Sequence, residues 1–218
     1  MDLIFFGMQG AGKGTLGKSI AERYGMKIFE TGGELRKLAQ EESELGKKIK
    51  SIIEAGHLVS DEVVMEIVEN FLSHLDKNSS VLFDGIPRKV EQAKLLNDLL
   101  LKHNREYKGL LIDIKKETAL RRLTTRRICK TCKAVYSADY NKTNCEAKTA
   151  NGEQCDGELI TRSDDNPSAI ETRLNAFENE TVPAIKIYED RLIKIDGEPR
   201  IEEVEKLAIS ALDTIMKV

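Results

Sequence analysis

Short apolar runs alternate with longer amphipathic segments along most of the chain. The apolar runs predict strands at residues 3–6, 27–29, 81–84, 110–114 and 191–196. In the segments between them, leucine and isoleucine return every three or four residues, which is typical of helices. This spacing predicts helices at residues 13–24, 61–75, 90–102, 117–127, 169–190 and 201–216. Because strands that alternate with helices form parallel sheets covered on both faces, the pattern predicts an α/β fold.

Two stretches interrupt this alternation and predict inserts in a core domain. Residues 30–59 favour a small helical insert that ends near Gly56, with Ser60 or Asp61 starting the next helix. Residues 125–165 are rich in Cys, Lys, Thr, Asn and Gly and lack a long stretch of periodic apolar residues. This composition favours an inserted lobe that is stabilised by a bound metal ion. The core domain is expected to comprise residues 1–29, 60–124 and 166–218.

Composition and charge exclude several classes of protein. The 218 residues have a formal net charge of -3 and only 5% aromatic residues, unlike the basic, aromatic-rich surfaces of nucleic-acid binders. No apolar run approaches the roughly 18 residues that a membrane span needs. The start MDLIFF has neither the basic lead nor the cleavage site of a signal peptide. The sequence therefore predicts a cytoplasmic protein without nucleic-acid or membrane partners.

The segment GMQGAGKGT, residues 7–15, lies between a predicted strand and a predicted helix. Its glycines allow backbone N–H groups to turn inward around phosphate oxygens, and the helix N-terminus adds partial positive charge. Gly7, Gly12 and Lys13 have the spacing of the P-loop, in which the lysine supplies a full charge. The hydroxyl that usually follows the lysine comes one position later, at Thr15. A turn without a ligand would not explain the lysine, so the segment predicts a nucleotide phosphate site.

Four further motifs follow the loop: TGGELR at residues 31–36, GHLVSDE at 56–62, DGIPRKVEQ at 84–92 and RRICKTC at 126–132. With them the chain resembles the nucleoside monophosphate kinases, most closely adenylate kinase with a zinc-bearing lid, over essentially its whole length. The resemblance implies a P-loop NTPase-type parallel sheet flanked by helices, with residues 30–59 as the NMP-binding insert and 125–165 as the lid. It also implies a monomer that transfers a phosphoryl group reversibly from Mg-ATP to AMP, giving two ADP for adenine nucleotide homeostasis.

The resemblance implies a set of contacts to the acceptor nucleotide. Arg36 and Arg88 would grip the AMP phosphate, because a guanidinium matches phosphate oxygens in a bidentate way. Thr31 and Gln92 would read the base, since an amide offers both a donor and an acceptor to a purine edge. Pyrimidine-preferring relatives typically have a small apolar residue in place of Thr31, which favours AMP. The complete AMP set is Thr31, Arg36, Val59, Gly85, Arg88, Gln92, Arg162 and Arg173.

On the donor side, Arg122 would lie on the ATP adenine and Arg126 would reach the ATP phosphates. The basic run at residues 121–127 is also compatible with a solvated helix face. Arg162 and Arg173 would close over the transferring phosphoryl group. The complete ATP set is Gly10, Ala11, Gly12, Lys13, Gly14, Thr15, Arg122 and Arg126.

No general base is predicted, because the second pKa of a phosphate is near 6 and the acceptor oxygen is already ionised at neutral pH. Catalysis then consists of positioning and charge neutralisation. Asp84, at a strand end, is the best carboxylate for the water shell of Mg²⁺. Gly33, followed by Glu34, stands where the family usually has an aspartate, which leaves a second acidic contact open. Asp164 and Asp165 match the family pair at the lid hinge. The predicted catalytic residues are Lys13, Asp84, Arg88, Arg126, Arg162 and Arg173.

Four cysteines fall within the predicted lid. Cys129 and Cys132 have the spacing of a metal knuckle, and in a reducing compartment such clusters are metal ligands more often than disulfides. With Cys145 and Cys155 they form a closed set that suits structural Zn²⁺. Family lids place the last two ligands two residues apart, whereas the nine residues EAKTANGEQ separate Cys145 from Cys155. Two carboxylates remain as alternatives to one of the thiols, Asp139 and Asp156.

Three other functions remain to be weighed. The same chemistry with UMP, CMP or GMP as acceptor is disfavoured by Thr31 and Gln92. A nucleic-acid-binding module, prompted by the cysteine knuckle and the basic run TTRRICKTCK, is disfavoured by the low aromatic content and the negative net charge. A P-loop switch without turnover is disfavoured because arginines suited to both a donor and an acceptor are present.

Overall fold

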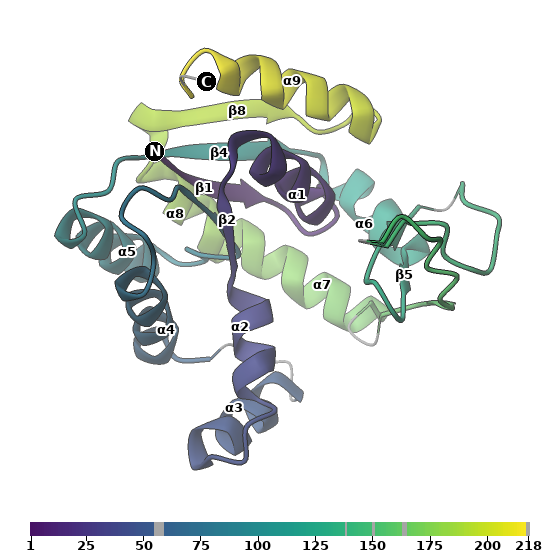
Figure 1. The fold of residues 1–218 in the computed structure, drawn as a ribbon, viewed down its shortest axis with the longest axis horizontal. Coiled ribbons are helices and arrows are strands. Elements are labelled where there is room, and N and C mark those ends of the chain that lie inside the picture. The colour runs from purple at the N-terminus through teal and green to yellow at the C-terminus, as the bar shows by residue number, and fades with distance from the viewer. Residues whose placement is uncertain (55–58, 138, 150, 163–164, 217–218) are drawn as a thin grey trace.

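The computed structural model describes residues 1–54, 59–137, 139–149, 151–162 and 165–216 (Figure 1). Its centre is a five-stranded sheet in the order β2-β3-β1-β4-β8, in which every pair of neighbouring strands is parallel. The strands are β1 (Asp2–Gly7), β2 (Lys27–Glu30), β3 (Val81–Asp84), β4 (Tyr107–Asp113) and β8 (Leu192–Asp196). The sheet confirms the predicted α/β class.

Both faces of the sheet are covered, because successive side chains of a strand point to opposite faces. A Cβ atom added to Gly17 of α1 (Lys13–Tyr24) would lie 3.2 Å from the ring of Phe5. The ring centroid of the next residue, Phe6, lies 5.2 Å from that of Tyr188, on the other face. All six residues of β1 are buried, as expected for a central parallel strand.

Helices occupy the segments between the strands, close to their predicted positions. Besides α1 they are α4 (Asp61–Ser73), α5 (Val90–Lys102), α6 (Lys116–Thr125), α7 (Pro167–Ala176), α8 (Val182–Lys186) and α9 (Ile201–Asp213). Helix α1 contacts β1, β2, β3 and α9, whereas α5 contacts α4 and α8. No helix in the described ranges combines the length and the apolar character that crossing a membrane requires.

A buried ion pair joins strands at the edge of the sheet where they begin. The Asp2 carboxylate, in a residue that is 1% exposed, accepts two hydrogen bonds from the Arg105 guanidinium, at 2.5 and 2.7 Å. It also accepts one from the Val81 backbone N–H at 2.9 Å. One carboxylate therefore links β1, the start of β3 and the turn before β4, and its buried charge is compensated.

The long helix predicted at residues 169–190 is wrong in its extent. Helix α7 begins earlier, at Pro167, because the Asn166 side chain accepts a hydrogen bond from the Ala169 N–H at 2.9 Å and caps the helix. A π-helical turn, Phe177–Thr181, follows, and α8 ends at Lys186. The irregular turn precedes Pro183, whose ring lacks the N–H that a continuous helix needs.

The two predicted inserts project from the core (Figure 1). The first contains α2 (Thr31–Leu38) and α3 (Glu44–Glu54), and Gly56, its predicted end, lies outside the described residues. The second contains a three-stranded antiparallel sheet in the order β6-β5-β7. Its strands are β5 (Arg127–Cys129), β6 (Val135–Tyr136) and β7 (Leu159–Ile160).

In the central sheet, strand β4 starts three residues before its predicted start at residue 110, because β1 pairs with it from Tyr107 onward.

Candidate active site

The glycine-rich loop has backbone angles that only glycine adopts readily. Gly10 and Gly12 have φ values of 88° and 87°, in the left-handed region. A Cβ atom on Gly10 would also lie 3.0 Å from the Ala119 carbonyl oxygen, so the loop needs glycine to approach α6. Lys13 is the first residue of α1, and the first N–H groups of a helix have no partner within the preceding turn of that helix. The predicted cradle for an anion is therefore built by the backbone.

Lys13 and Asp84 lie under this loop at the carboxyl edge of the sheet. The Lys13 Nζ donates to the Gly7 carbonyl oxygen at 2.6 Å. Burial lowers the pKa of Lys13, and the charge of Asp84 opposes that shift. Burial likewise raises the pKa of Asp84, opposed by Lys13. No group in the described parts of the chain donates a hydrogen bond to the Asp84 carboxylate, so its oxygens are available to accept from water bound to Mg²⁺.

Arg88 lies beside Asp84 and donates two hydrogen bonds, one from its side chain and one from its backbone. Its Nε donates to the Gly85 carbonyl oxygen at 3.1 Å, and its backbone N–H donates to Gln92 Oε1 at 2.8 Å. Gln92 Nε2 in turn donates to Asp61 Oδ1 at 2.8 Å. Burial lowers the pKa of Arg88, and Asp84 opposes the shift. Gln92 is 4% exposed, so it is a positioning group for Arg88, and its predicted contact with the AMP base stays a prediction.

Other predicted acceptor residues surround this arginine. Thr31 is buried and its hydroxyl donates to the Asp84 backbone oxygen at 3.4 Å. Val59, the last residue before the Ser60 cap of α4, is also buried. Arg36 lies near enough for its charge to lower the pKa of Arg88, and its Nη2 donates to Glu30 Oε1 at 3.0 Å. The structure therefore brings Thr31 and Arg36 of α2 close to Gly85 and Arg88, which follow β3.

Asp165 joins two of the predicted phosphate-binding arginines. Its carboxylate accepts from Arg126 at 2.8 and 2.7 Å and from Arg173 at 2.9 Å. The Asp165 side chain is fully buried, and its backbone N–H donates to the Arg162 carbonyl oxygen at 3.1 Å. The sequence predicted a hinge pair here, but it did not predict that Asp165 would hold two arginines together. The signal in the sequence was a pair of acidic residues shortly after Arg162. Asp164, the other member of the pair, lies outside the described residues.

Asp165→Asn is expected to lower kcat about 10- to 100-fold, because two arginines lose the carboxylate that positions them. The free energy of unfolding is expected to fall by about 1.5–3 kcal/mol, the usual contribution of a hydrogen bond to a charged group. Steady-state kinetics and thermal melts check both values. Asp213→Asn is the matched control, because Asp213 makes an exposed ion pair with Arg23 that contributes little. A normal kcat in Asp165→Asn contradicts the assignment.

The Arg122 guanidinium contacts both the glycine-rich loop and the segment that follows β8. Its Nη2 donates to the carbonyl oxygens of Gly197, Glu198 and Pro199 at 3.0 to 3.2 Å. Its Nη1 donates to the Gly10 carbonyl oxygen at 3.4 Å. A solvated basic helix face does not explain these contacts. The contribution of the residues after β8 was missed by sequence reasoning, because it arises from a contact between distant segments.

The four cysteines converge in the second insert. Their sulfur atoms all lie within 4.8 Å of one another. The Sγ of Cys129 is 3.7 Å from that of Cys155, and the Sγ of Cys132 is 3.4 Å from that of Cys145. Four sulfurs placed 2.3 Å from a tetrahedral zinc are about 3.8 Å apart. The spacing is far too long for disulfides and fits a metal-bound thiolate set.

A hairpin accommodates the long spacing between the last two cysteines. The backbone N–H of Cys155 donates to the Ala147 carbonyl oxygen at 2.9 Å, and that of Asp156 donates to the Cys145 carbonyl oxygen at 3.0 Å. The Tyr136 hydroxyl donates to Cys145 Sγ at 3.1 Å and holds this thiol in place. The Asp156 carboxylate accepts from Asn144 Nδ2 at 3.1 Å instead of joining the sulfurs.

The backbone around Cys129 favours its thiolate form, which metal binding needs. Burial by itself would raise the pKa of the Cys129 thiol. The N–H groups of Cys132 and Thr131, at 3.4 and 3.3 Å from its sulfur, and the thiols of Cys132 and Cys145 all donate to this sulfur. Together these hydrogen bonds outweigh burial and lower the pKa to about 6.

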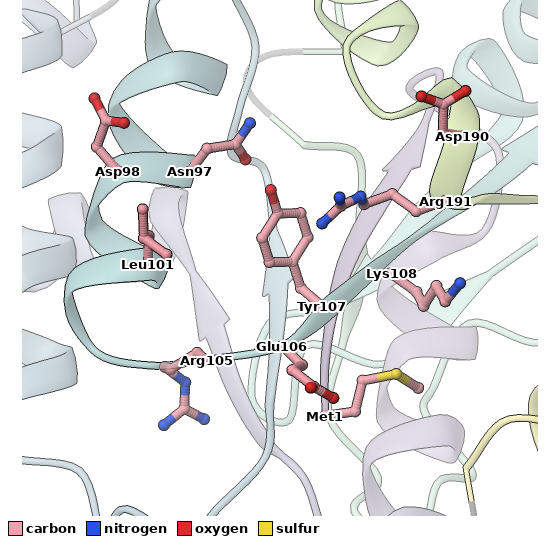
Figure 2. A pocket seen from close by; sticks show the side chains of 10 residues that line it. All are labelled: Met1, Asn97, Asp98, Leu101, Arg105, Glu106, Tyr107, Lys108, Asp190 and Arg191. Atoms are coloured by element: carbon pink, nitrogen blue, oxygen red, sulfur yellow. The ribbon is translucent and has the colours of Figure 1, made fainter.

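A surface cavity of about 580 Å³ lies elsewhere, at the opposite edge of the central sheet (Figure 2). Its lining includes Met1, which precedes β1, and Tyr107, the first residue of β4. Figure 2 shows the Arg191 guanidinium beside the Tyr107 ring, and its central carbon is 4.9 Å from the ring centroid. Because open parallel sheets bind ligands at the carboxyl ends of their strands, this cavity is separate from the P-loop site.

A P-loop that faces a strand-end carboxylate and several convergent arginines defines a nucleotide-binding α/β protein of the phosphotransferase class. A family model for adenylate kinase matches residues 5–193. The adenylate kinase of Alkaliphilus oremlandii is 40% identical over 97% of this chain and 98% of its own length. Those of Bacillus licheniformis and Fervidobacterium nodosum are 39% and 34% identical, over 94% and 97% of both chains. The chain belongs to the adenylate kinase family.

Proposed function

We propose that this chain catalyses reversible, Mg²⁺-dependent phosphoryl transfer between ATP and AMP, giving two ADP, at the carboxyl edge of its central sheet. The observation that carries the proposal is the convergence of Lys13, Asp84, Arg88 and Asp165-bound arginines beside the P-loop. The family to which the chain belongs carries the same function in its name. Phosphoryl transfer needs little covalent chemistry from the protein, so such positioned charges suffice.

The donor would lie on the P-loop. The loop from Gly10 to Thr15 and the Lys13 ammonium would bind its phosphates, with Arg126 reaching them from the second insert. The Ala11 and Thr15 N–H groups already donate to Met8 and Gly12, so other N–H groups of the loop would contact the phosphates. Arg122 would pack on the adenine, next to the connection after β8 that it already contacts. Mg²⁺ bound with ATP neutralises charge on the donor phosphates. Asp84 would hold the water shell of that ion.

The acceptor would enter between α2, α4 and the end of β3. Arg36 and Arg88 would bind the AMP phosphate, and Arg162 and Arg173 would close over the group in transit. The acceptor oxygen is ionised at neutral pH, so no side chain has to remove a proton. The remaining proposed contacts to AMP are those of Thr31, Val59, Gly85 and Gln92.

The second insert would be a lid held by structural Zn²⁺ on Cys129, Cys132, Cys145 and Cys155. The support is the chemistry and spacing of the four sulfurs. With this lid at residues 125–165, residues 30–59 would form the AMP-binding insert, and residues 1–29, 60–124 and 166–218 the core. A cytoplasmic location and a monomeric state stay predictions from the sequence and the resemblance.

An acceptor panel tests the proposed substrate. ADP formation from Mg-ATP is measured with AMP, UMP, CMP, GMP or no acceptor, using one enzyme preparation. We expect turnover with AMP to exceed that with any other acceptor by at least about 100-fold, because a site built for polar groups rejects bases that leave them unpaired. Equal turnover with another nucleotide contradicts the base contacts of Thr31 and Gln92. Absence of turnover with every acceptor contradicts the proposed function.

A further inference from the structure

Two carboxylates end neighbouring strands beside the P-loop. Glu30 is the last residue of β2 and Asp84 is the last residue of β3, and the two are partners in the parallel register. Side chains of register partners project to the same face of a sheet. Glu30 is close enough for its charge to act on Asp84 and on Arg88. The proposed magnesium site therefore has a second acidic side chain beside it.

The Glu30 carboxylate occupies the space next to Gly33. A Cβ atom added to Gly33 would lie 3.1 Å from Glu30 Oε2 and 3.6 Å from the Glu30 carboxyl carbon. Gly33 belongs to α2 and its backbone is not in the left-handed region, so conformation does not require glycine there. A side chain at position 33 would therefore begin in tight contact with an acidic group that comes from the preceding strand end.

The neighbouring acid, Glu34, is engaged elsewhere. Its Oε1 accepts from Lys37 Nζ at 2.6 Å, one turn along α2. Glu30 pairs with Arg36 instead, at 3.0 Å, and both of these side chains are 55% exposed. An ion pair with this exposure is weak. The phosphate of a bound acceptor competes for the Arg36 guanidinium by stronger, charge-assisted bonds, which releases Glu30.

We propose that Glu30 is a positioning residue for the hydrated Mg²⁺ of the donor, and that it supplies from β2 the acidic contact that Gly33 lacks. The proposal rests on the proposed function of Asp84 at the same ion. Magnesium keeps several of its waters in proteins, and carboxylates that accept hydrogen bonds from them orient the ion. Because Arg36 holds Glu30 until the acceptor arrives, the contact forms in the complex that contains both nucleotides.

The test measures metal affinity in the absence of turnover. Mn²⁺ replaces Mg²⁺, and free Mn²⁺ is followed by electron paramagnetic resonance in the presence of enzyme, the β,γ-imido analogue of ATP and saturating AMP. We expect Glu30→Gln and Glu30→Ser to weaken Mn²⁺ binding by about tenfold, the lower end of outer-shell effects. Adding Gly33→Asp to Glu30→Ser is expected to restore most of the affinity, because the shortened side chain vacates the space that the new carboxylate needs.

Two further variants separate the possible outcomes. Glu34→Gln removes the same charge four residues further along, in α2, and is expected to leave Mn²⁺ affinity unchanged. Asp84→Asn is expected to weaken Mn²⁺ binding at least as much as Glu30→Gln. If Asp84→Asn weakens binding and both Glu30 variants do not, or if Glu34→Gln is as harmful, the role of Glu30 is wrong. If Asp84→Asn has no effect, the proposed metal site itself is wrong, and the inference falls with it.

Discussion

Replacing Lys13 with alanine is expected to lower kcat at least about 100-fold, the usual cost of losing one preorganised charge or donor. The lysine lies at the start of α1 with its ammonium against the Gly7 carbonyl oxygen. Burial lowers its pKa, so its charge is poorly hydrated before substrate binds and interacts strongly with phosphate when it does. The thermal midpoint is expected to change by only about 2–4 °C, because the lost hydrogen bonds are few.

Steady-state rates and thermal melts of the purified variant check this prediction. Lys18→Ala is the matched control, because Lys18 is an exposed lysine of the same helix. We expect the control to retain the original kcat and midpoint. A Lys13→Ala enzyme with a normal rate contradicts the role of the lysine, and one that has unfolded would show that the loop depends on it structurally.

Cys145→Ser is expected to abolish stoichiometric zinc binding and to destabilise the lid. Cys145 is fully buried, and its sulfur contacts both Cys132 and the Tyr136 hydroxyl. Structural zinc contributes folding free energy directly. A loss of about 3 kcal/mol corresponds to a fall of about 6–12 °C in the midpoint for a chain of this size. Acceptor preference is expected to stay the same, because Thr31 and Gln92, the proposed contacts to the acceptor base, lie outside this insert.

Metal analysis, thermal melts and the acceptor panel check this prediction together. Asp139→Asn and Asp156→Asn are the controls, since both carboxylates are alternatives to a thiol by sequence and neither belongs to the sulfur cluster. Both variants are expected to keep zinc and the original midpoint. Protein that is purified without chelators and contains no zinc contradicts the proposed metal. Zinc loss in a carboxylate variant contradicts the set of four thiols.

Much of the core follows from local patterns in the sequence. The five strands and the helices α1 and α5 lie at or near their predicted positions, because apolar periodicity reports which face is buried. The P-loop was predictable because its motif is local, with its glycines and lysine within nine residues of one another. The apolar periodicity at residues 169–190 does not show the break before α8, although Pro183 marks it in the sequence.

The arrangement of the candidate site was predictable in composition and not in contacts. The sequence indicated the arginines, Asp84 and the four cysteines. It did not indicate that Asp165 joins Arg126 to Arg173, because the bond to Arg126 spans 39 positions. Nor did it indicate that the buried side-chain amide of Gln92 accepts a hydrogen bond from the Arg88 backbone N–H and so positions Arg88.

The sequence by itself determined the fold class, the phosphate cradle and the family, because each depends on residues close together in the chain or on motifs in a set order. The tertiary structure decided three further points: that a hairpin brings Cys145 to Cys155, that Asp165 lies buried between two arginines, and that Glu30 occupies the space beside Gly33. Each of these depends on backbone hydrogen bonding, burial or packing, which place side chains in space and leave no local pattern in the sequence.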